Sequence, residues 1–194
     1  MLGRLLGFGI LELTKFTDDA FTLAVSPAYT IKLAEQDAED EAMLDITKEY
    51  DTLVRANGSK DVYTKPNKKS AIMTMNVVNP VHDDLKLLLF PDAQKIIDGV
   101  TPTKTKIEYY DQIGLLLSEW QNAVRAVFKP VDADEVALAA KYWVTFPRAV
   151  LVPSLKGSAS AKPGKTKIDI VSIGGLDGVT RVPLVIDGDE TATP

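Results

Sequence analysis

The chain has 194 residues, of which 45% are hydrophobic and 25% charged, and its net charge is −5; this composition is typical of a globular protein and excludes global disorder and a fibrous repeat. It has no cysteine and one histidine, His82, so disulfides, thiolate nucleophiles and any site with two histidine ligands are excluded within one chain. The acidic balance argues against general nucleic-acid binding, which depends on clustered Lys and Arg.

Targeting and membrane signals are weak. The apolar residues near the start reach Glu12 quickly and lack a small-residue cleavage site, so secretion is not expected. No run approaches the roughly 20 apolar residues of a membrane span. We therefore expect no stable membrane association.

The first third of the chain predicts short strands followed by an acidic segment. Residues 5–13, 21–25 and 29–33 are apolar or alternating and are interpreted as three strands. Acids then concentrate between Glu35 and Asp51, which favours a solvated loop or short helix. A calcium loop is the alternative, but the glycine and regular alternation of an EF-hand are missing.

Residues 50–78 carry the clearest local pattern. Residues 50–55 and 62–64 flank Asn57-Gly58, a strong hairpin signal. Residues 65–69 predict a polar turn, because Pro66 is unsuited to a central strand. Residues 70–78 then alternate and predict a strand.

Two helical pieces are expected after this strand. Asn79-Pro80 ends the strand, and His82 or Asp83 can cap a helix. Its first turns carry leucines at helical spacing, namely Leu85, Leu88 and Leu89. A second piece begins at Pro91, carries Ile96 and Ile97, and closes at Gly99. Both pieces are expected to pack on a sheet.

The middle of the second half is interpreted as mainly helical. Residues 105–110 have strand composition, whereas the apolar spacing in residues 113–128 favours a helix. Asp132 can cap another helix that runs to Ala139 and Ala140. These helices would form an insertion at about residues 111–141.

The end of the chain predicts strands again. Residues 142–146 and 149–152 are interpreted as strands separated by Pro147, and residues 155–165 have the composition of a flexible loop. Residues 165–173 alternate, Gly174 to Gly178 mark a turn, and residues 179–186 can pair back as a closing hairpin.

Candidate chemistry is sparse, and the chain is not predicted to be an enzyme. His82-Asp83-Asp84 suits helix capping better than a catalytic His–carboxylate pair. Residues 174–178 lack the Lys and Ser/Thr of a phosphate loop. Tyr142, Trp143 and Phe146 could stack bases or sugars, but core packing is favoured. We predict no catalytic, cofactor-binding or metal-binding residue, although a hydrolase that uses two carboxylates stays open.

Charges of opposite sign are separated along the chain. Lysines recur in residues 65–69 and 156–167, whereas acids concentrate in residues 35–51. A basic loop of one copy could therefore meet an acidic surface of the next. Two independently solvated surfaces would give the same pattern.

The order of features from Arg55 to Leu89 resembles that of tail tube subunits of phage tails and related contractile injection machines. The resemblance is carried by the hairpin through Asn57-Gly58 and Lys65-Pro66-Asn67, the alternating strand at residues 71–78, the Asn79-Pro80 break and the helix beginning at His82. Residues 143–153, followed by the strand at residues 166–173, are similar as well. Together these stretches cover about half the chain.

The resemblance implies one mainly β domain over residues 1–194, of the α+β class: a β-sandwich or half-barrel of antiparallel strands with flanking helices. Such subunits would form hexameric, stacked rings around a channel for DNA, which passes only as cargo. Other partners would be sheath, baseplate or terminator proteins, and the location would be the virion after assembly in the host cytoplasm.

Within this resemblance, eight residues of the hairpin and the following strand are candidates for subunit contacts. They are Arg55, Asn57, Lys65, Lys68, Lys69, Ile72, Met73 and Met75. The predicted helical insertion departs from a minimal tube subunit. It leaves open another tail component, such as a terminator, tube-end or baseplate adaptor, or a capsid decoration protein.

Overall fold

A computed structural model describes residues 2–54, 60–78, 83–99, 104–109, 119–156, 165–173 and 183–192. The described part is mainly β, with one large antiparallel sheet, a separate two-stranded ribbon and one α-helix. The elements are β1 (Leu2–Gly7), β2 (Gly9–Lys15), β3 (Tyr29–Ile31), the 3₁₀ helix η1 (Leu33–Glu35), β4 (Ala42–Val54), β5 (Lys60–Val78), α1 (Asp83–Leu89), β6 (Gln94–Asp98), β7 (Lys104–Glu108), β8 (Val124–Pro130), the 3₁₀ helix η2 (Ala140–Tyr142), β9 (Val144–Lys156), β10 (Lys165–Ser172) and β11 (Ile186–Asp187).

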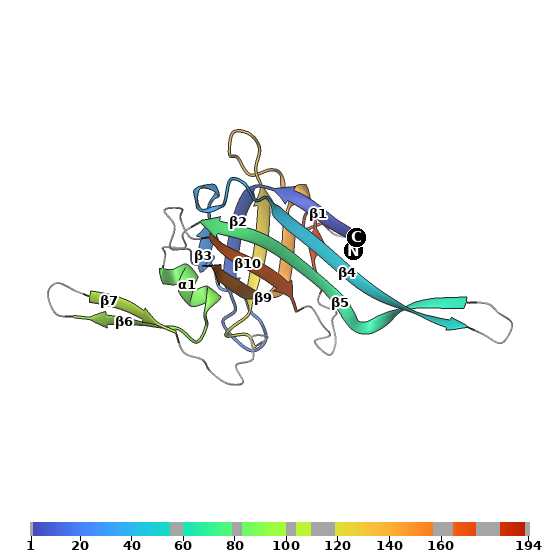
Figure 1. Cartoon of the computed structure of the whole chain (residues 1–194), viewed down its shortest axis with the longest axis horizontal. Helices are drawn as coiled ribbons and strands as arrows, with labels where there is room; N and C mark the ends of the chain where they lie inside the picture. Colours follow the sequence, from blue (N-terminus) through green and yellow to red (C-terminus); the bar gives the residue numbers. More distant parts are fainter. Residues whose placement is uncertain are drawn as a thin grey trace.

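The large sheet bends back on itself. Its strand order is β1-β4-β5-β10-β9-β8-β2-β3, with β11 paired to β9. Only Phe8 separates β1 from β2 in the sequence, yet the two strands lie near opposite ends of this order. The sheet must therefore curl, and Figure 1 shows β4 and β5 crossing in front of the strands behind them.

Two glycines make the corner between β1 and β2 possible. Gly7 has a φ of 72°, in the left-handed region that glycine adopts without strain. Gly9 lies against β8, where an added Cβ would be 2.5 Å from the backbone oxygen of Lys129. A side chain at Gly9 would thus push β2 away from β8.

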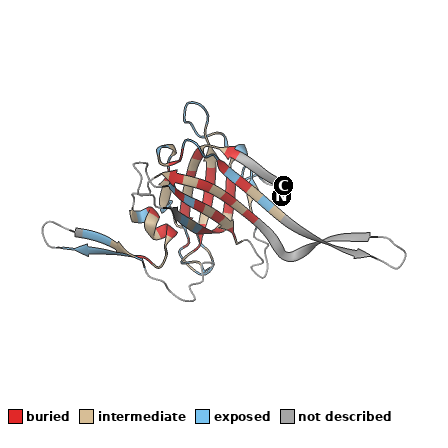
Figure 2. Ribbon diagram, in the orientation of Figure 1, coloured by how far each residue is buried: buried red, intermediate tan, exposed pale blue. Residues whose placement is uncertain are grey.

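One hydrophobic core fills the inside of the curled sheet (Figure 2). Over residues 71–78 of β5, buried residues alternate strictly with half-buried ones, as a strand at the surface of a core requires. The expected helix is confirmed as α1, and its leucines at positions 85, 88 and 89 are buried in this core. The largest fully buried side chains are Phe128, Phe146, Leu11, Leu13, Ile31, Met73, Met75, Leu85, Ile168 and Ile170.

Gln36 fastens the segment after η1 to both layers of strands. Its Nε2 donates to the backbone oxygen of Gly9 in β2, and its Oε1 accepts the Gly9 N–H at 3.5 Å. Gln36 also forms an isolated bridge with Val77 of β5. Because the side chain is buried, these hydrogen bonds satisfy backbone groups that water cannot reach.

The prediction of helices at residues 91–99 and 113–140 is wrong over the residues that the structure describes, which are 91–99 and 119–140. Residues 94–98 form β6, and residues 124–130 form β8 between β2 and β9. The apolar residues of β8 fit either periodicity, and pairing on both edges selects the strand. Asp132 caps a turn and not a helix, since its Oδ1 accepts the N–H groups of Asp134 and Val136 at 3.0 and 2.9 Å.

Two prolines that were expected to interrupt strands lie at irregularities within continuous strands. Residues 65–69 belong to β5, where four residues lie opposite Glu49 of β4, because Tyr50 pairs with Thr64 and Lys48 with Lys69. Pro147 lies in β9, where two residues lie opposite Arg125 of β8. A bulge accommodates a residue that cannot donate to the ladder.

Three further strand predictions need correction. Of residues 21–25, the structure shows only an isolated bridge, between Phe16 and Leu23. The described end of the predicted closing hairpin, β11, pairs with β9 and not with β10. Residues 5–13, predicted as one strand, belong to two strands, β1 and β2. The predicted strands at residues 29–33, 70–78, 105–110 and 165–173 are confirmed over their described residues as β3, β5, β7 and β10.

Candidate functional site

Two β-ribbons extend from the body on opposite sides (Figure 1). One is the outer part of the β4–β5 pair, in which residues 50–54 pair with residues 60–64. The other is the β6–β7 ribbon, in which residues 94–98 pair with residues 104–108. Every residue of β6 is exposed, and Ile97 is 61% exposed. An isolated two-stranded ribbon is only marginally stable in water, so its attachment to the body matters.

Contacts at its base attach the β6–β7 ribbon to α1. Lys95 Nζ lies 2.9 Å from Asp83 Oδ2, and the rings of Phe90 and Tyr109 meet edge to face at 5.0 Å. Asp83 and Tyr109 also line an open hollow of about 270 Å³ between α1 and β7. These contacts orient the ribbon and leave its outer part exposed.

The outward side of the sheet is exposed or half-buried over the described part of β4, β5 and β10 and at Val152 of β9, whereas Val150 of β9 is buried. Cross-strand pairing places Met43, Thr74, Asp169 and Val152 in one row across the four strands. The next row contains Asp45, Ile72, Val171 and Val150. Met43 and Val152 are 38% and 42% exposed, and Ile72 and Val171 are half-buried.

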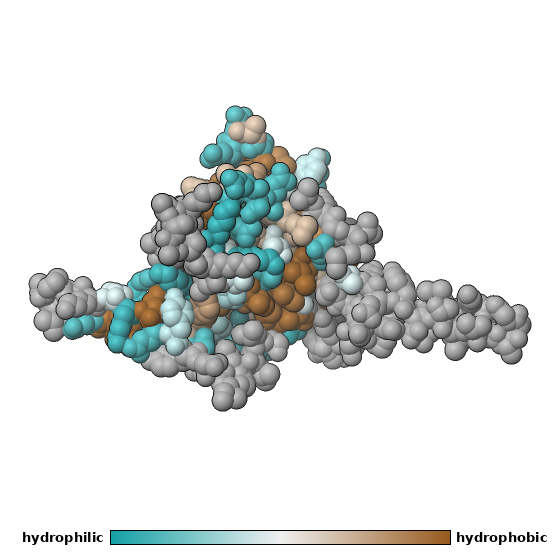
Figure 3. Space-filling view, in the orientation of Figure 1, coloured by the Kyte–Doolittle hydropathy of each residue, from teal (hydrophilic) through white to brown (hydrophobic). Residues whose placement is uncertain are grey.

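We call Met43, Ile72, Val152 and Val171, with Asp45 and Asp169 beside them, the open face. Figure 3 shows hydrophobic residues gathered on the side of the body that carries β5 and β10. Asp169 is held within this face, because its Oδ1 accepts the Thr74 hydroxyl at 2.6 Å and its Oδ2 lies 3.0 Å from Lys167 Nζ. The open face thus combines apolar side chains with fixed carboxylates.

The outward side of β8 and the start of β9 is covered instead. Val127 and Thr145 are cross-strand partners on this side, and they are only 3% and 1% exposed. Lys129 Nζ lies 2.5 Å from Glu12 Oε1 and 4.4 Å from the centroid of the Trp143 ring.

The charges on this side are paired as well. Arg125 forms an ion pair with Glu190 of the C-terminal segment, and the Gly188 N–H donates to the Trp143 oxygen at 2.8 Å. We call Arg125, Val127, Lys129 and Thr145 the closed face.

The acidic segment meets a lysine of its own chain. Lys165, at the start of β10, forms an ion pair with Asp37, and its Nζ lies 3.4 Å from Glu39 Oε2 and 3.7 Å from Asp40 Oδ2. The hydrogen bond from Lys165 holds the pKa of Asp37 below its usual value. Asp37 in turn raises the pKa of Lys165. Part of the charge complementarity expected between copies is therefore used within the chain.

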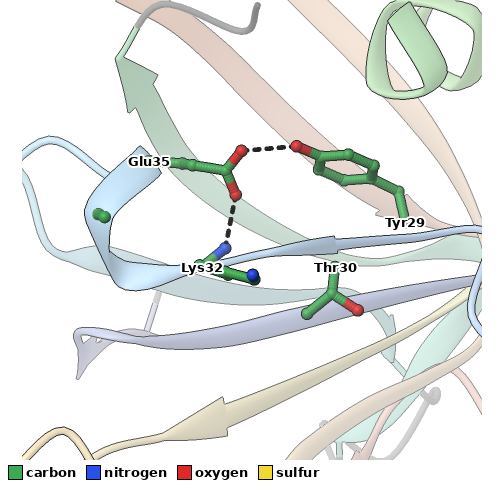
Figure 4. Close-up of a pocket in the computed structure, with 5 residues that line it drawn as sticks. Tyr29, Thr30, Lys32 and Glu35 are labelled. Atoms are coloured by element: carbon green, nitrogen blue, oxygen red, sulfur yellow. Dashed lines mark hydrogen bonds between the residues drawn. The ribbon is translucent and has the colours of Figure 1, made fainter. Parts of the chain in front are cut away.

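A second hollow, of about 290 Å³, lies beside β3 (Figure 4). The Tyr29 hydroxyl donates to Glu35 Oε1 at 2.5 Å, and Glu35 Oε2 accepts the Lys32 N–H at 2.8 Å. Burial, followed by the hydrogen bond to Glu35, raises the pKa of Tyr29 well above its usual value. Tyr29 therefore stays protonated, and the carboxylate that could accept its proton is engaged in fixing the 3₁₀ turn.

The structure separates the predicted contact residues. Met73 and Met75 are buried in the core and cannot offer their side chains to another subunit, whereas Ile72 lies on the open face. Three further candidates, Lys65, Lys68 and Lys69, lie on β5, but their side chains are outside the described part of the structure. Arg55 and Asn57 lie outside the described residues altogether.

The other candidate residues are placed as follows. His82 and residues 174–178 lie outside the described residues. Phe146 is fully buried, and Trp143 Nε1 donates to the Leu138 oxygen at 2.7 Å. Tyr142 is 45% exposed beside Lys141. The three aromatic residues of this stretch therefore form no stacking platform.

Metal and membrane features are absent from the described part of the chain. Within it, no three His, Asp or Glu side chains gather closely enough to hold a metal ion. No helix among the same residues is long and apolar enough to cross a membrane.

Sequence reasoning found only parts of these two surfaces, namely Ile72 of the open face and the strand β7 of the ribbon. The β6–β7 ribbon carries adjacent β-branched residues, Ile96 and Ile97, which favour a strand, but the helical interpretation hid this signal. The alternation in residues 70–78 separates two sides of a strand without indicating which side is covered.

Comparison with known proteins adds no relative. No protein-family model matches the sequence, and no curated protein sequence matches it.

Proposed function

We propose that this chain is a phage tail tube subunit, which assembles with copies of itself into stacked hexameric rings that form a channel for DNA delivery. The observation that carries the proposal is the exposed β6–β7 ribbon opposite the β4–β5 ribbon, on a body that is one large antiparallel sheet. In this proposal the curled sheet with α1 is the sandwich or half-barrel body, and the ribbons reach neighbouring subunits.

The surfaces of the chain fit assembly better than catalysis. Both hollows described above are open, and neither brings a pair of carboxylates together, because one is lined by Glu35 as its single acid and the other by Asp83. Such a pair would be expected of a hydrolase that uses two acids. The open face carries partly exposed apolar side chains beside Asp45 and Asp169, a mixture that suits a protein–protein contact.

The acidic chain also suits a conduit. Its net charge of −5 gives little attraction for phosphate, so DNA would pass without being held. The resident partners would be other copies of this chain and neighbouring tail proteins, namely sheath, baseplate or terminator, in the virion.

Electron microscopy of the purified full chain tests this function. We expect rings with a central channel, and tubes at higher concentration, in negative-stain images, with a matching increase in mass by light scattering. Rings that never stack would favour a terminator or adaptor in place of a tube subunit. Compact monomers at high concentration would contradict the proposal.

A further inference from the structure

The methionines of this chain differ sharply in exposure. The sequence has four, and the structure describes the side chains of Met43, Met73 and Met75. Met73 and Met75 are 0% and 2% exposed, whereas Met43 is 38% exposed on the open face. Because the chain has no cysteine, methionine sulfur is the first target that it offers to a peroxide. Among the three described methionines, the fold leaves one sulfur accessible and protects two.

Strand pairing explains why Met43 differs from the other two. Met43 lies opposite Thr74 of β5, and Thr74 stands between Met73 and Met75 in the sequence. Successive residues of a strand point to opposite sides of the sheet, so Met43 is on the outward side and Met73 and Met75 are on the inward side. Leu44, the next residue of β4, is buried in the core. The difference in exposure therefore comes from the side of the sheet on which each sulfur lies.

The surroundings of Met43 accommodate an oxidised side chain. Its cross-strand neighbour Thr74 donates its hydroxyl to Asp169 Oδ1 at 2.6 Å, and Asp45 follows on the same side of β4. A sulfoxide oxygen at this partly exposed position can be hydrated without entering the core. At Met73 the same polar oxygen would lie among apolar side chains, which is unfavourable. Met43 can therefore be oxidised in the folded chain, whereas Met73 cannot be oxidised without disturbing the core.

We propose that Met43 is a reversible oxidation site, which a peroxide modifies in the folded chain while Met73 and Met75 stay reduced. In the forward step the Met43 sulfur attacks one oxygen of hydrogen peroxide and the O–O bond breaks. The sulfur loses two electrons and becomes a sulfoxide, and the other oxygen leaves as water after it takes the proton of the transferred oxygen. In the reverse step a methionine sulfoxide reductase releases the oxygen as water, and two thiols of the reductant become a disulfide. This site goes beyond the proposed function and does not depend on self-assembly.

Peptide mass spectrometry tests the site in the full chain. Trypsin cleaves after lysine and arginine, so one peptide, residues 33–48, carries Met43 alone and another, residues 70–86, carries Met73 and Met75. The folded chain is treated with hydrogen peroxide at a concentration at which light scattering shows single molecules. We expect peptide 33–48 to gain an oxygen at least about tenfold faster than peptide 70–86, because core methionines react only when the chain opens.

The matched control is the same chain unfolded in urea, in which both peptides should be oxidised at similar rates. Met43→Leu should abolish the gain of oxygen in peptide 33–48 and leave the folded-state rate of peptide 70–86 unchanged. A sulfoxide reductase with dithiothreitol should return peptide 33–48 to its original mass while circular dichroism shows a folded chain. Equal rates in the folded chain, a difference that persists in urea, or a Met43 sulfoxide that the reductase cannot reduce in the folded chain would each overturn the proposal.

Discussion

The closed face and the open face both lie on the outward side of the sheet, but they differ in how far the chain's own residues bury them. On the closed face, Val127 and Thr145 are buried, and Arg125 and Lys129 each have a carboxylate partner. On the open face, Met43 and Val152 keep more than a third of their surface exposed. The same sheet thus has outward residues that its own chain buries and outward residues that stay partly exposed.

The two faces differ in which residues lie against them and not in the residue types of their strands. Both halves have apolar residues on the outward side, as Val127 and Val152 show. On the closed face, Glu190 is ion-paired with Arg125, and the Trp143 ring lies against Lys129. Equivalent substitutions on the two faces should therefore lower the free energy of unfolding by unequal amounts.

The largest expected effect contrasts the two sides of β5. Met73 is fully buried, whereas its neighbour Ile72 lies on the open face. Met73→Ala should lower the free energy of unfolding by about 2–5 kcal/mol, because it leaves a cavity in the core. Ile72→Ala should cost about 1 kcal/mol or less, as expected for a partly exposed side chain.

Urea unfolding followed by circular dichroism measures both variants of β5. Ile72→Ala is also expected to weaken assembly by light scattering, because it removes apolar area from the open face. Similar losses of stability for the two variants would contradict the assignment of Ile72 to an exposed surface.

A second comparison sets the closed face directly against the open face. Val127→Asn buries an amide without a partner and removes apolar burial, so it should lower the free energy of unfolding by about 3 kcal/mol. Val152→Asn changes an exposed position and should stay within about 0.5 kcal/mol of the unmodified chain.

Thermal unfolding by calorimetry separates these two valine variants. Because both substitutions are Val→Asn on outward positions of neighbouring strands, propensity effects largely cancel. A Val152→Asn variant that unfolds as easily as Val127→Asn would show that the open face is covered within the chain.

The sequence predicted those parts of the fold in which local pattern and long-range pairing agree. The alternation in residues 70–78 and 165–173 and the spacing of Leu85, Leu88 and Leu89 were sufficient for β5, β10 and α1. β8 was missed because its apolar residues suit a helix or a strand, and its pairing with β2 and β9 decides between them.

The candidate surface was less predictable for a related reason. Alternation shows that Ile72 and Met73 face opposite ways, but burial depends on which side the rest of the chain covers. That choice is made by the corner at Gly7 and Gly9, more than 60 residues away in the sequence. The contact candidates therefore came from both sides of a correctly predicted strand, and of these Met73 and Met75 are buried in the core.

The smallest expected effect concerns the ion pair that ties the acidic segment to β10. The folded-state pKa of Asp37 lies below its usual value of about 3.9. Asp37 therefore adds stability above about pH 4, which is lost as the pH falls through its folded-state pKa. The pKa of Lys165 is raised, so its contribution is present below about pH 10 and is lost as the pH rises beyond its folded-state pKa.

Asp37→Asn should thus lower stability at pH 7 and converge with the unmodified chain near pH 2, in urea unfolding measured across this range. Asp40→Asn is the control, because Asp40 lies 3.7 Å from Lys165 Nζ and is more exposed than Asp37, so its effect should be smaller. A deficit in Asp37→Asn that is the same at pH 2 and pH 7 would contradict an electrostatic origin. It would assign the effect to the Glu39 N–H, which donates to Asp37 Oδ1 at 3.1 Å and organises the turn independently of Lys165.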